Sequence, residues 1–183
     1  ICCGNTTSIV LSSFTPGTSF SWTVAQNGVS GASPGSGTTI AQVLCTTSTS
    51  PGTATYTVTP TANNCAGNPI TVVITVNPTP VATATPAAQT ICSGDTTNIA
   101  LTGNVTHTTF SWTVVQSGGV TGASNGNGST IAQILSTGSA QGTAVYTVTP
   151  TANNCPGTPI TVTITVNPKP VATATPPSQT ICS

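Results

Sequence analysis

Residues 160–166 read ITVTITV, and this stretch decides the fold. Its four apolar residues are Ile160, Val162, Ile164 and Val166, and a threonine stands between each of them and the next. Successive side chains of an extended chain point to opposite faces, so the pattern predicts a β-strand with one buried face. Isoleucine, valine and threonine are all β-branched, which favours a strand over a helix.

The same alternation occurs in two other stretches, FSWTV at 110–114 and AVYTVTP at 144–150, and NIAL and TIAQIL add shorter apolar runs. Between these runs lie SGD, QSGGVTGASNGNGS, GSAQG and NNCPGTP, which are rich in turn-forming residues. We count about seven strands and no helix. A domain of about ninety residues built in this way is predicted to be an all-β, antiparallel sandwich of the immunoglobulin type.

The chain contains this domain more than once. YTVTPTANNC occupies 56–65 and again 146–155, and the pair Ile-Cys at 1–2 recurs at 91–92 and 181–182. A period of ninety residues fits a small domain rather than one turn of a solenoid. The sequence begins and ends inside this motif, which predicts a segment of a longer polypeptide.

Three parts are therefore expected. Residues 1–78 form a first repeat that lacks its leading strand, residues 79–168 form a second repeat, and residues 169–183 form a linker and the first strand of a third. The linkers, NPTPVATATP and NPKPVATATPPSQ, contain closely spaced prolines that end the sheet and stiffen the joint. VATATP is expected to open the next repeat.

Two aromatic residues in each repeat are predicted to lie in the core. Trp22 and Trp112 occupy the strand in which such sandwiches bury a tryptophan, and Tyr56 and Tyr146 begin the penultimate strand, where a tyrosine corner is found. The alternative is a solvent-facing aromatic that stacks on sugars, and the alternation disfavours it.

Charge is almost absent. Asp95 and Lys169 are the only acidic and basic side chains of the 183 residues, and His107 is the single histidine. A chain without a basic face cannot neutralise phosphates, which argues against nucleic acid as a partner. No apolar run approaches the roughly 18 residues that a membrane-spanning helix needs.

Catalysis and metal binding have little material. A nucleophile needs a base and an orienting group, and His107 could pair only with Asp95. One carboxylate is too few for calcium, and the absence of a CxxC pair disfavours zinc. A Lys–Asn isopeptide crosslink would need a lysine in each core, whereas Lys169 lies in a linker. We therefore expect no enzymatic activity, no metal and no cofactor.

Seven cysteines indicate an oxidising, extracellular setting. Cys2 and Cys65, and likewise Cys92 and Cys155, are sixty-three positions apart, which predicts one bridge within each repeat: Cys2–Cys65 and Cys92–Cys155. A rival pairing with a spacing of twenty-seven, Cys65–Cys92 and Cys155–Cys182, would join neighbouring repeats. The intradomain pairing is favoured, and the partner of Cys182 stays open.

A second bridge is predicted in the first repeat alone. Cys3 and Cys45 are both replaced by serine in the second repeat, at Ser93 and Ser136. Joint replacement suggests contact, and neighbouring residues of an extended chain point to opposite sides, so Cys2 and Cys3 can have different partners.

Glycosylation is a further candidate modification. Asn5, Asn104 and Asn127 lie in triplets that match the N-linked acceptor, although such triplets are common by chance. Thr96, in Asp95-Thr96-Thr97, resembles the O-glycosylation acceptor of some gliding bacteria.

QTICSGDTTNIALTG, FSWTV and GTAVYTVTPTANNCPGTPITVTITVNPKP together resemble the PKD-like (polycystic-kidney-disease-like), immunoglobulin-type repeats of very large bacterial surface adhesins. Those of gliding bacteria that use type IX secretion are the most similar. The resemblance covers both repeats. It implies a secreted stalk or filament segment, anchored elsewhere in its chain and used for adhesion or gliding motility.

Three classes of function follow. The first is a non-catalytic stalk at the cell surface, whose partners are neighbouring repeats and surface glycans. The second is a self-assembling fibre in which one copy donates a strand to another, since threonine-rich edge strands without charge can pair side by side. The third is a carbohydrate-binding module of a secreted enzyme.

Overall fold

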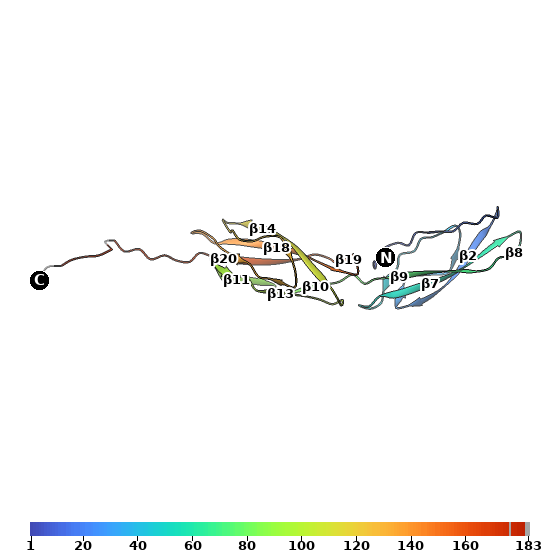
Figure 1. Cartoon of the computed structure of the whole chain (residues 1–183), viewed down its shortest axis with the longest axis horizontal. Coiled ribbons are helices and arrows are strands. Elements are labelled where there is room, and N and C mark those ends of the chain that lie inside the picture. The colour runs from blue at the N-terminus through green and yellow to red at the C-terminus, as the bar shows by residue number, and fades with distance from the viewer. Residues whose placement is uncertain (176, 182–183) are drawn as a thin grey trace. The chain divides into compact units, whose positions relative to one another are not determined.

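The computed structural model describes residues 1–175 and 177–181, and its regular elements are strands (Figure 1). Within these residues there is no apolar helix of membrane-spanning length. Residues 168–175 and 177–181 carry no strand. Cys182 lies outside the described residues.

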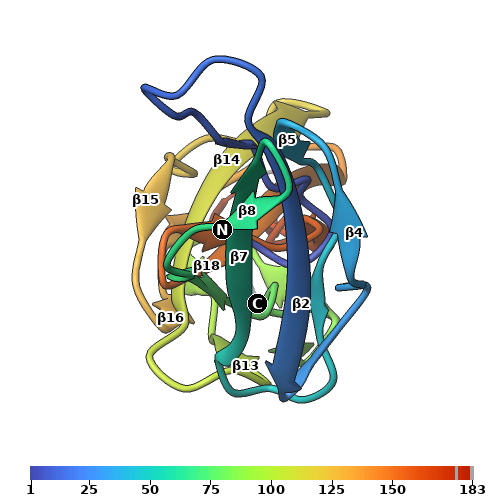
Figure 2. The same cartoon turned by 90° about the vertical axis from the view of Figure 1, so that its right-hand side faces the viewer.

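The first repeat comprises nine strands: β1 (Ile9–Val10), β2 (Ser19–Asn27), β3 (Val29–Ser30), β4 (Gly35–Ser36), β5 (Thr39–Ile40), β6 (Cys45–Thr46), β7 (Gly52–Ala62), β8 (Cys65–Ala66) and β9 (Ile70–Val76). Its main sheet has the order β4-β2-β7-β8. The last strand, β9, also pairs with β7, on the edge that faces away from β2. Figure 2 shows β2 and β7 side by side, antiparallel from Ser19↔Thr61 to Asn27↔Thr53. The pairs β1–β5 and β3–β6 form two smaller sheets.

The second repeat repeats this plan with two leading strands: β10 (Ala82–Thr85), β11 (Ala88–Cys92), β12 (Asp95–Thr96), β13 (Ile99–Gly103), β14 (Thr109–Ser117), β15 (Gly126–Asn127), β16 (Thr130–Ile131), β17 (Ile134–Leu135), β18 (Gly142–Ala152), β19 (Cys155–Pro156) and β20 (Ile160–Asn167). One sheet has the order β11-β20-β18-β14-β15, and a second has the order β10-β13-β16. The VATATP segment thus opens this repeat through β10, as the sequence predicts. β11 runs parallel to β20, whereas β18 and β20 are antiparallel.

The predicted alternation is present. In β20, Val162, Ile164 and Val166 are fully buried and the threonines between them face outward. Their counterparts in β9 are more exposed, since only Val76 of that strand is buried. Among the described residues, β20 pairs with β11 along its free edge, whereas β9 has β7 as its one strand partner.

Each repeat contains more strands than the predicted seven, because several are two residues long. These short strands interrupt the glycine- and serine-rich segments between β14 and β18, where few apolar side chains fix a longer pairing. The core is continuous nonetheless. In the first repeat it contains Leu11, Phe20, Trp22, Val29, Ile40, Leu44, Ala54, Tyr56, Val58 and Val76.

The chain divides by contacts into two compact units that do not coincide with the repeats. Unit 1 holds Ile1–Ala82, Thr102–Phe110 and Thr149–Pro159, and unit 2 holds most of the second repeat. The turn between β18 and β19 therefore belongs to unit 1, together with the whole first repeat.

Candidate functional site

The disulfide pairing differs from the one that spacing predicts. Cys2 is bonded to Cys155, with the two Cα atoms 5.5 Å apart, and the bridge spans 153 positions of the chain. The predicted bridges Cys2–Cys65 and Cys92–Cys155 are therefore wrong. The rival pairing of Cys65 with Cys92 is also absent, because both are free and exposed among the described residues.

The length of β7 explains why Cys2 cannot reach Cys65. Cys2 lies beside Asn77, which follows the end of β9, and that end of β9 pairs with Gly52 at the start of β7. Cys65 pairs with Ala62 at the other end of β7. The ten steps between the 11 residues of β7, at about 3.3 Å each, place the two cysteines about 33 Å apart, whereas a disulfide needs Cα atoms within about 7 Å.

Each repeat thus has two chemically distinct ends. We call the end with Asn77 in the first repeat, and with Asn167 in the second, the exit end, since the last strand finishes there. We call the end with the β7–β8 turn, or the β18–β19 turn, the turn end. The Cys2–Cys155 bond joins the exit end of the first repeat to the turn end of the second, entirely within unit 1.

Several contacts accompany this bond. The backbone N–H of Val81 donates to Asn104 Oδ1 at 2.7 Å, and the Asn104 N–H donates to the Val81 carbonyl at 3.2 Å. Gly157 lies so close to Pro80 that any side chain at this position would collide with the Pro80 carbonyl. The linker that leaves the first repeat is therefore seated against the turn end of the second.

The turn that presents Cys155 has a fixed backbone conformation. Asn153 and Asn154 adopt positive φ values of 50° and 61°, a left-handed region that asparagine tolerates better than most residues. Asn63 and Asn64 of the first repeat have values of 49° and 62°. The identical ANNC sequences thus form the same turn, whether or not the cysteine is bonded.

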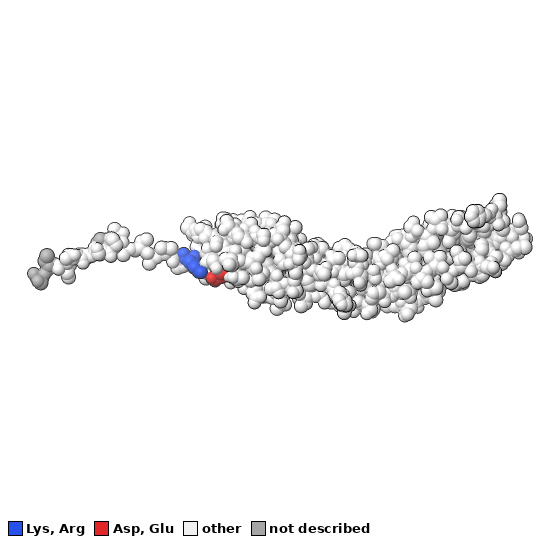
Figure 3. Space-filling model, in the orientation of Figure 1, with Lys and Arg blue, Asp and Glu red and all other residues white. Residues whose placement is uncertain are grey.

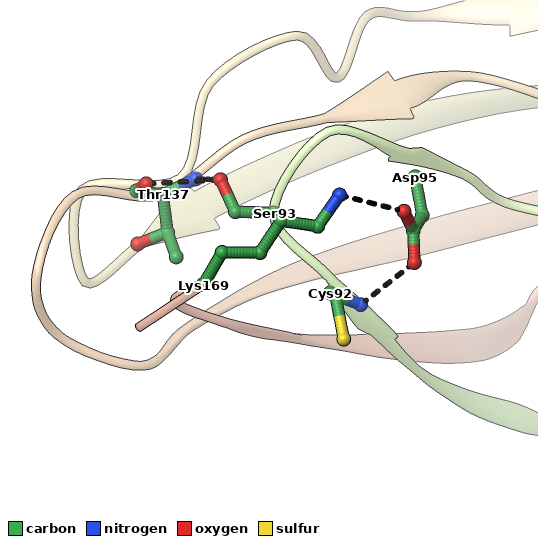
Figure 4. Close-up of polar contacts among 5 residues, drawn as sticks. All are labelled: Cys92, Ser93, Asp95, Thr137 and Lys169. Atoms are coloured by element: carbon green, nitrogen blue, oxygen red, sulfur yellow. Dashed lines mark hydrogen bonds and ion pairs between the residues drawn. The ribbon is translucent and has the colours of Figure 1, made fainter. Parts of the chain in front are cut away.

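The second bridge pairs Cys3 with Cys45, the pair that joint replacement by serine predicts. Their counterparts in the second repeat do not bond each other. Instead, Ser93 Oγ donates to the Thr137 carbonyl at 3.0 Å and accepts from the Thr137 N–H at 2.9 Å (Figure 4). A pair of hydrogen bonds to the backbone thus stands where the first repeat has a covalent bond.

The two charged side chains form an ion pair at the exit end of the second repeat. Lys169 Nζ lies 3.1 Å from Asp95 Oδ1, and both side chains are about half exposed (Figures 3 and 4). The hydrogen bond from Lys169, with that from the Cys92 N–H, holds the pKa of Asp95 below its ordinary value. Exposed pairs of this kind contribute little to stability, so the pair does not indicate a reactive site.

A polar network that the apolar pattern did not predict lies at the margin of the core of each repeat, where hydrogen bonds connect a half-buried glutamine to the two buried aromatic side chains. In the first repeat, Tyr56 Oη donates to Gln42 Oε1 at 2.7 Å, and Gln42 Nε2 donates to the Ser33 carbonyl at 2.9 Å. The same carbonyl accepts from Trp22 Nε1 at 3.2 Å, and the Gln42 N–H donates to Thr7 Oγ1. The second repeat has this network in full, with Tyr146, Gln133, Ser124, Trp112 and Thr97.

The aromatic predictions are therefore correct in burial and incorrect in one detail. Trp22, Trp112, Tyr56 and Tyr146 are all at most 7% exposed. The tyrosines do not form a tyrosine corner, because each hydroxyl bonds a glutamine side chain rather than backbone upstream. Burial raises the pKa of Tyr146 to about 12. The signal in the sequence was the glutamine retained in TIAQ in both repeats.

The remaining candidates lie on the surface. Asn5, Asn127 and Thr96 are exposed, and Asn104 is exposed but uses its amide oxygen to hold Val81. His107 is exposed in a loop with a positive φ of 59°. No cluster of three or more histidine, cysteine, aspartate or glutamate side chains occurs among the described residues.

A hollow of about 350 Å³ lies at the turn end of the first repeat. Small and uncharged residues line it, together with the free Cys65: Ser13, Thr15, Thr18, Pro60, Thr61, Ala62, Asn63, Ala66 and Gly67. The hollow contains no acid, base or aromatic ring. Its chemistry suits a peptide segment better than a reacting substrate.

The comparisons with known proteins agree with a tandem repeat. The family model described as "PKD-like domain" matches residues 1–80 and 89–170. No curated protein matches the sequence. Among solved structures, the N-terminal four Ig domains of Dscam1 isoform 1.9 align over 92% of this chain and 42% of that one, at 12% identity and a TM-score of 0.36.

The Escherichia coli adhesin FdeC aligns over 88% of this chain and 54% of its own, at 19% identity and a TM-score of 0.29. This chain thus spans about half the length of the structures that it matches. The family model covers nearly the whole sequence in two consecutive copies. The chain belongs to the PKD-like domain family.

Proposed function

We propose that this chain is a non-catalytic, tension-bearing segment of the stalk of a long extracellular surface protein that serves adhesion. The Cys2–Cys155 bond carries the proposal, because it ties one repeat to the next through a covalent link other than the backbone. Disulfides persist in oxidising surroundings, which supports an extracellular location.

The position of this bond determines how force travels through the chain. Tension applied at the two termini enters at Ile1, crosses the disulfide from Cys2 to Cys155 and leaves through β20. The residues between the two cysteines lie outside this path. Only about 30 residues can then be drawn out, which is about 100 Å of extended chain at 3.3–3.6 Å per residue.

The composition suits the same role. With one charge of each sign, electrostatic interactions at the surface change little with salt or pH. A carbohydrate-binding module would need an exposed aromatic platform, and the two tryptophans are 7% and 6% exposed. The resemblance to adhesins of gliding bacteria extends the proposal to type IX secretion, which predicts a C-terminal sorting domain in the full-length protein.

Single-molecule stretching of the chain, held at both termini, tests the proposal. We expect a fully stretched end-to-end length of about 100 Å without reductant and about 600 Å with it, since reduction frees all 183 residues. The variant Cys2→Ser/Cys155→Ser is the control, and it should reach a stretched length of about 480 Å without reductant, because Cys3–Cys45 still closes 42 positions. Equal extension with and without reductant would contradict a load-bearing bond.

A further inference from the structure

The two free cysteines occupy the same structural positions as the two bonded ones. Cys92 is the counterpart of Cys2, and Cys65 is the counterpart of Cys155, each displaced by ninety residues. We propose that Cys92 and Cys65 are the open halves of the same inter-repeat bridge: Cys92 bonds the turn-end cysteine of a following copy of the repeat, and Cys65 bonds the entry cysteine of a preceding copy.

The exit end of the second repeat has the form of the bonded one. Cys92 pairs with Asn167 in parallel register, as Cys2 pairs with Asn77. Yet Cys92 is exposed and Pro170 of the following linker is exposed, whereas Cys2 is partly buried and Pro80 is buried. The surfaces that are covered in the joined pair are therefore present and uncovered here.

The turn end of the first repeat shows the complementary half. Cys155 is 1% exposed, whereas Cys65 is free and exposed on a turn whose φ values differ by about one degree from those of its counterpart. The turn at Cys65 thus has the conformation of the bonded turn although Cys65 itself is not bonded.

Gly67 gives independent support. Its counterpart Gly157 must be glycine because the Pro80 carbonyl of the preceding linker would collide with a side chain. A Cβ atom added at Gly67 would lie 3.1 Å from Pro60 Cγ, and the atoms close to it belong to Pro60 rather than to a linker. A glycine kept at this position, beside an empty hollow, is explained if a linker of another copy is seated there.

The hollow at the turn end fits this occupant. Ser13 and Thr15, which line it, flank Phe14, a residue fully exposed to solvent. Phe14 corresponds to Asn104, the residue that holds the Val81 backbone in the joined pair. The segment Pro170-Val171 repeats the sequence Pro80-Val81 and would supply the incoming linker.

Bond formation needs an oxidant, for which a small disulfide such as oxidised glutathione suffices. The Cys92 thiolate attacks the glutathione disulfide and releases one glutathione thiol. The Cys65 thiolate of the second copy then attacks the mixed disulfide and releases the other. Two protein thiols are oxidised, and one small disulfide is reduced to two thiols.

A mixing experiment with a second copy of this chain tests the proposal. Cys65→Ser keeps only Cys92 as a reactive half and Cys92→Ser keeps only Cys65, with Cys182→Ser in both and ¹⁵N in one. After mixing with oxidised glutathione, mass spectrometry counts the dimers. Random collision gives heterodimers and total homodimers in equal amounts, whereas docking predicts at least a tenfold excess of heterodimers.

Three results would overturn the proposal: random proportions, monomers capped by glutathione, or an intramolecular Cys65–Cys92 bond in the wild-type chain. Gly67→Val in the Cys92→Ser partner tests the linker seat, and we expect it to lower the heterodimer yield about tenfold. The Thr75→Val variant, on the exposed face of β9, should leave the yield unchanged. An undiminished yield with Gly67→Val would rule out docking of the linker in the hollow. The proposal does not depend on a stalk function, because it concerns association alone.

Discussion

The hydrogen bond between the buried Tyr146 and the half-buried Gln133 gives a prediction in which the effect of one substitution depends on the other. Tyr146 is fully buried, and its hydroxyl donates to Gln133 Oε1 at 2.7 Å. Tyr146→Phe removes this bond but leaves Gln133 bonded to Ser124, so it should cost about 1 kcal/mol. Gln133→Leu leaves the hydroxyl without a partner in the core and should cost about 2–3 kcal/mol.

The two changes together should not add. Once Gln133→Leu has removed the acceptor, Tyr146→Phe removes an unsatisfied hydroxyl, and its effect should be close to zero or stabilising. The coupling between the two sites is then about 1–2 kcal/mol. Additive costs in the double variant, within about 0.5 kcal/mol, would refute the reasoning.

Urea unfolding followed by ¹⁹F NMR of 5-fluorotryptophan measures each repeat separately, because Trp22 and Trp112 lie in different repeats. All variants carry serine at positions 65, 92 and 182, so that free thiols cannot exchange with the disulfides. The matched control is the cycle of Tyr56→Phe and Gln42→Leu. It should reproduce the same coupling on the Trp22 signal and leave the Trp112 signal unchanged.

Three further predictions use the same assay. Gly126→Ala places a methyl group 2.9 Å from Cζ2 of the buried Trp112 ring and should destabilise the second repeat by about 1–3 kcal/mol, whereas Gly138→Ala, with no atom within 4 Å, should be neutral or slightly stabilising. An equal effect of the two would contradict tight packing at Gly126. Cys3→Ser/Cys45→Ser opens a loop of 42 positions and should lower the free energy of unfolding of the first repeat by about 4 kcal/mol. The stability of the second repeat should not change. A loss of stability in both tryptophan signals would show that the repeats unfold as one. Because burial raises the pKa of Tyr146 to about 12, above the unfolded value near 10, the stabilising contribution is complete below pH 10 and is lost as the pH rises toward 12. Tyr146→Phe should flatten this decline in the second repeat, and an unchanged decline would assign it to another group.

The sandwich could be predicted because its evidence is local. The alternation at 160–166 requires only that neighbouring side chains point to opposite faces, and β20 buries Val162, Ile164 and Val166, while Ile160 at the start of the strand is half-buried. Trp22 and Trp112 were predictable for the same reason. Gln42 and Gln133 were not, because a pattern of apolar residues gives no weight to a polar side chain that finds its partners across the core.

The predicted partners of Cys2 and Cys92 were wrong for a topological reason. Spacings of sixty-three and twenty-seven are compatible with several pairings, and the choice depends on the end of the sheet at which each cysteine lies. A wholly antiparallel arrangement leaves Cys92 free to approach Cys155. In fact β11 runs parallel to β20, which places Cys92 beside Asn167 at the exit end. The direction of this leading strand therefore keeps Cys92 away from Cys155, and spacing within the sequence does not reveal that direction.

A bridge from one entry segment to the next turn end has a consequence for an array of such repeats. Cys92, where the next bridge of the same kind would begin, lies within the stretch of chain between Cys2 and Cys155. Successive loops then overlap, so a single break in the backbone between two entry cysteines is always spanned by at least one disulfide. A bridge confined to one repeat would protect that repeat but leave every linker as a single point of failure. If Cys92 and Cys65 are paired as proposed, covalent continuity is maintained across each linker, where bridges within a repeat cannot provide it.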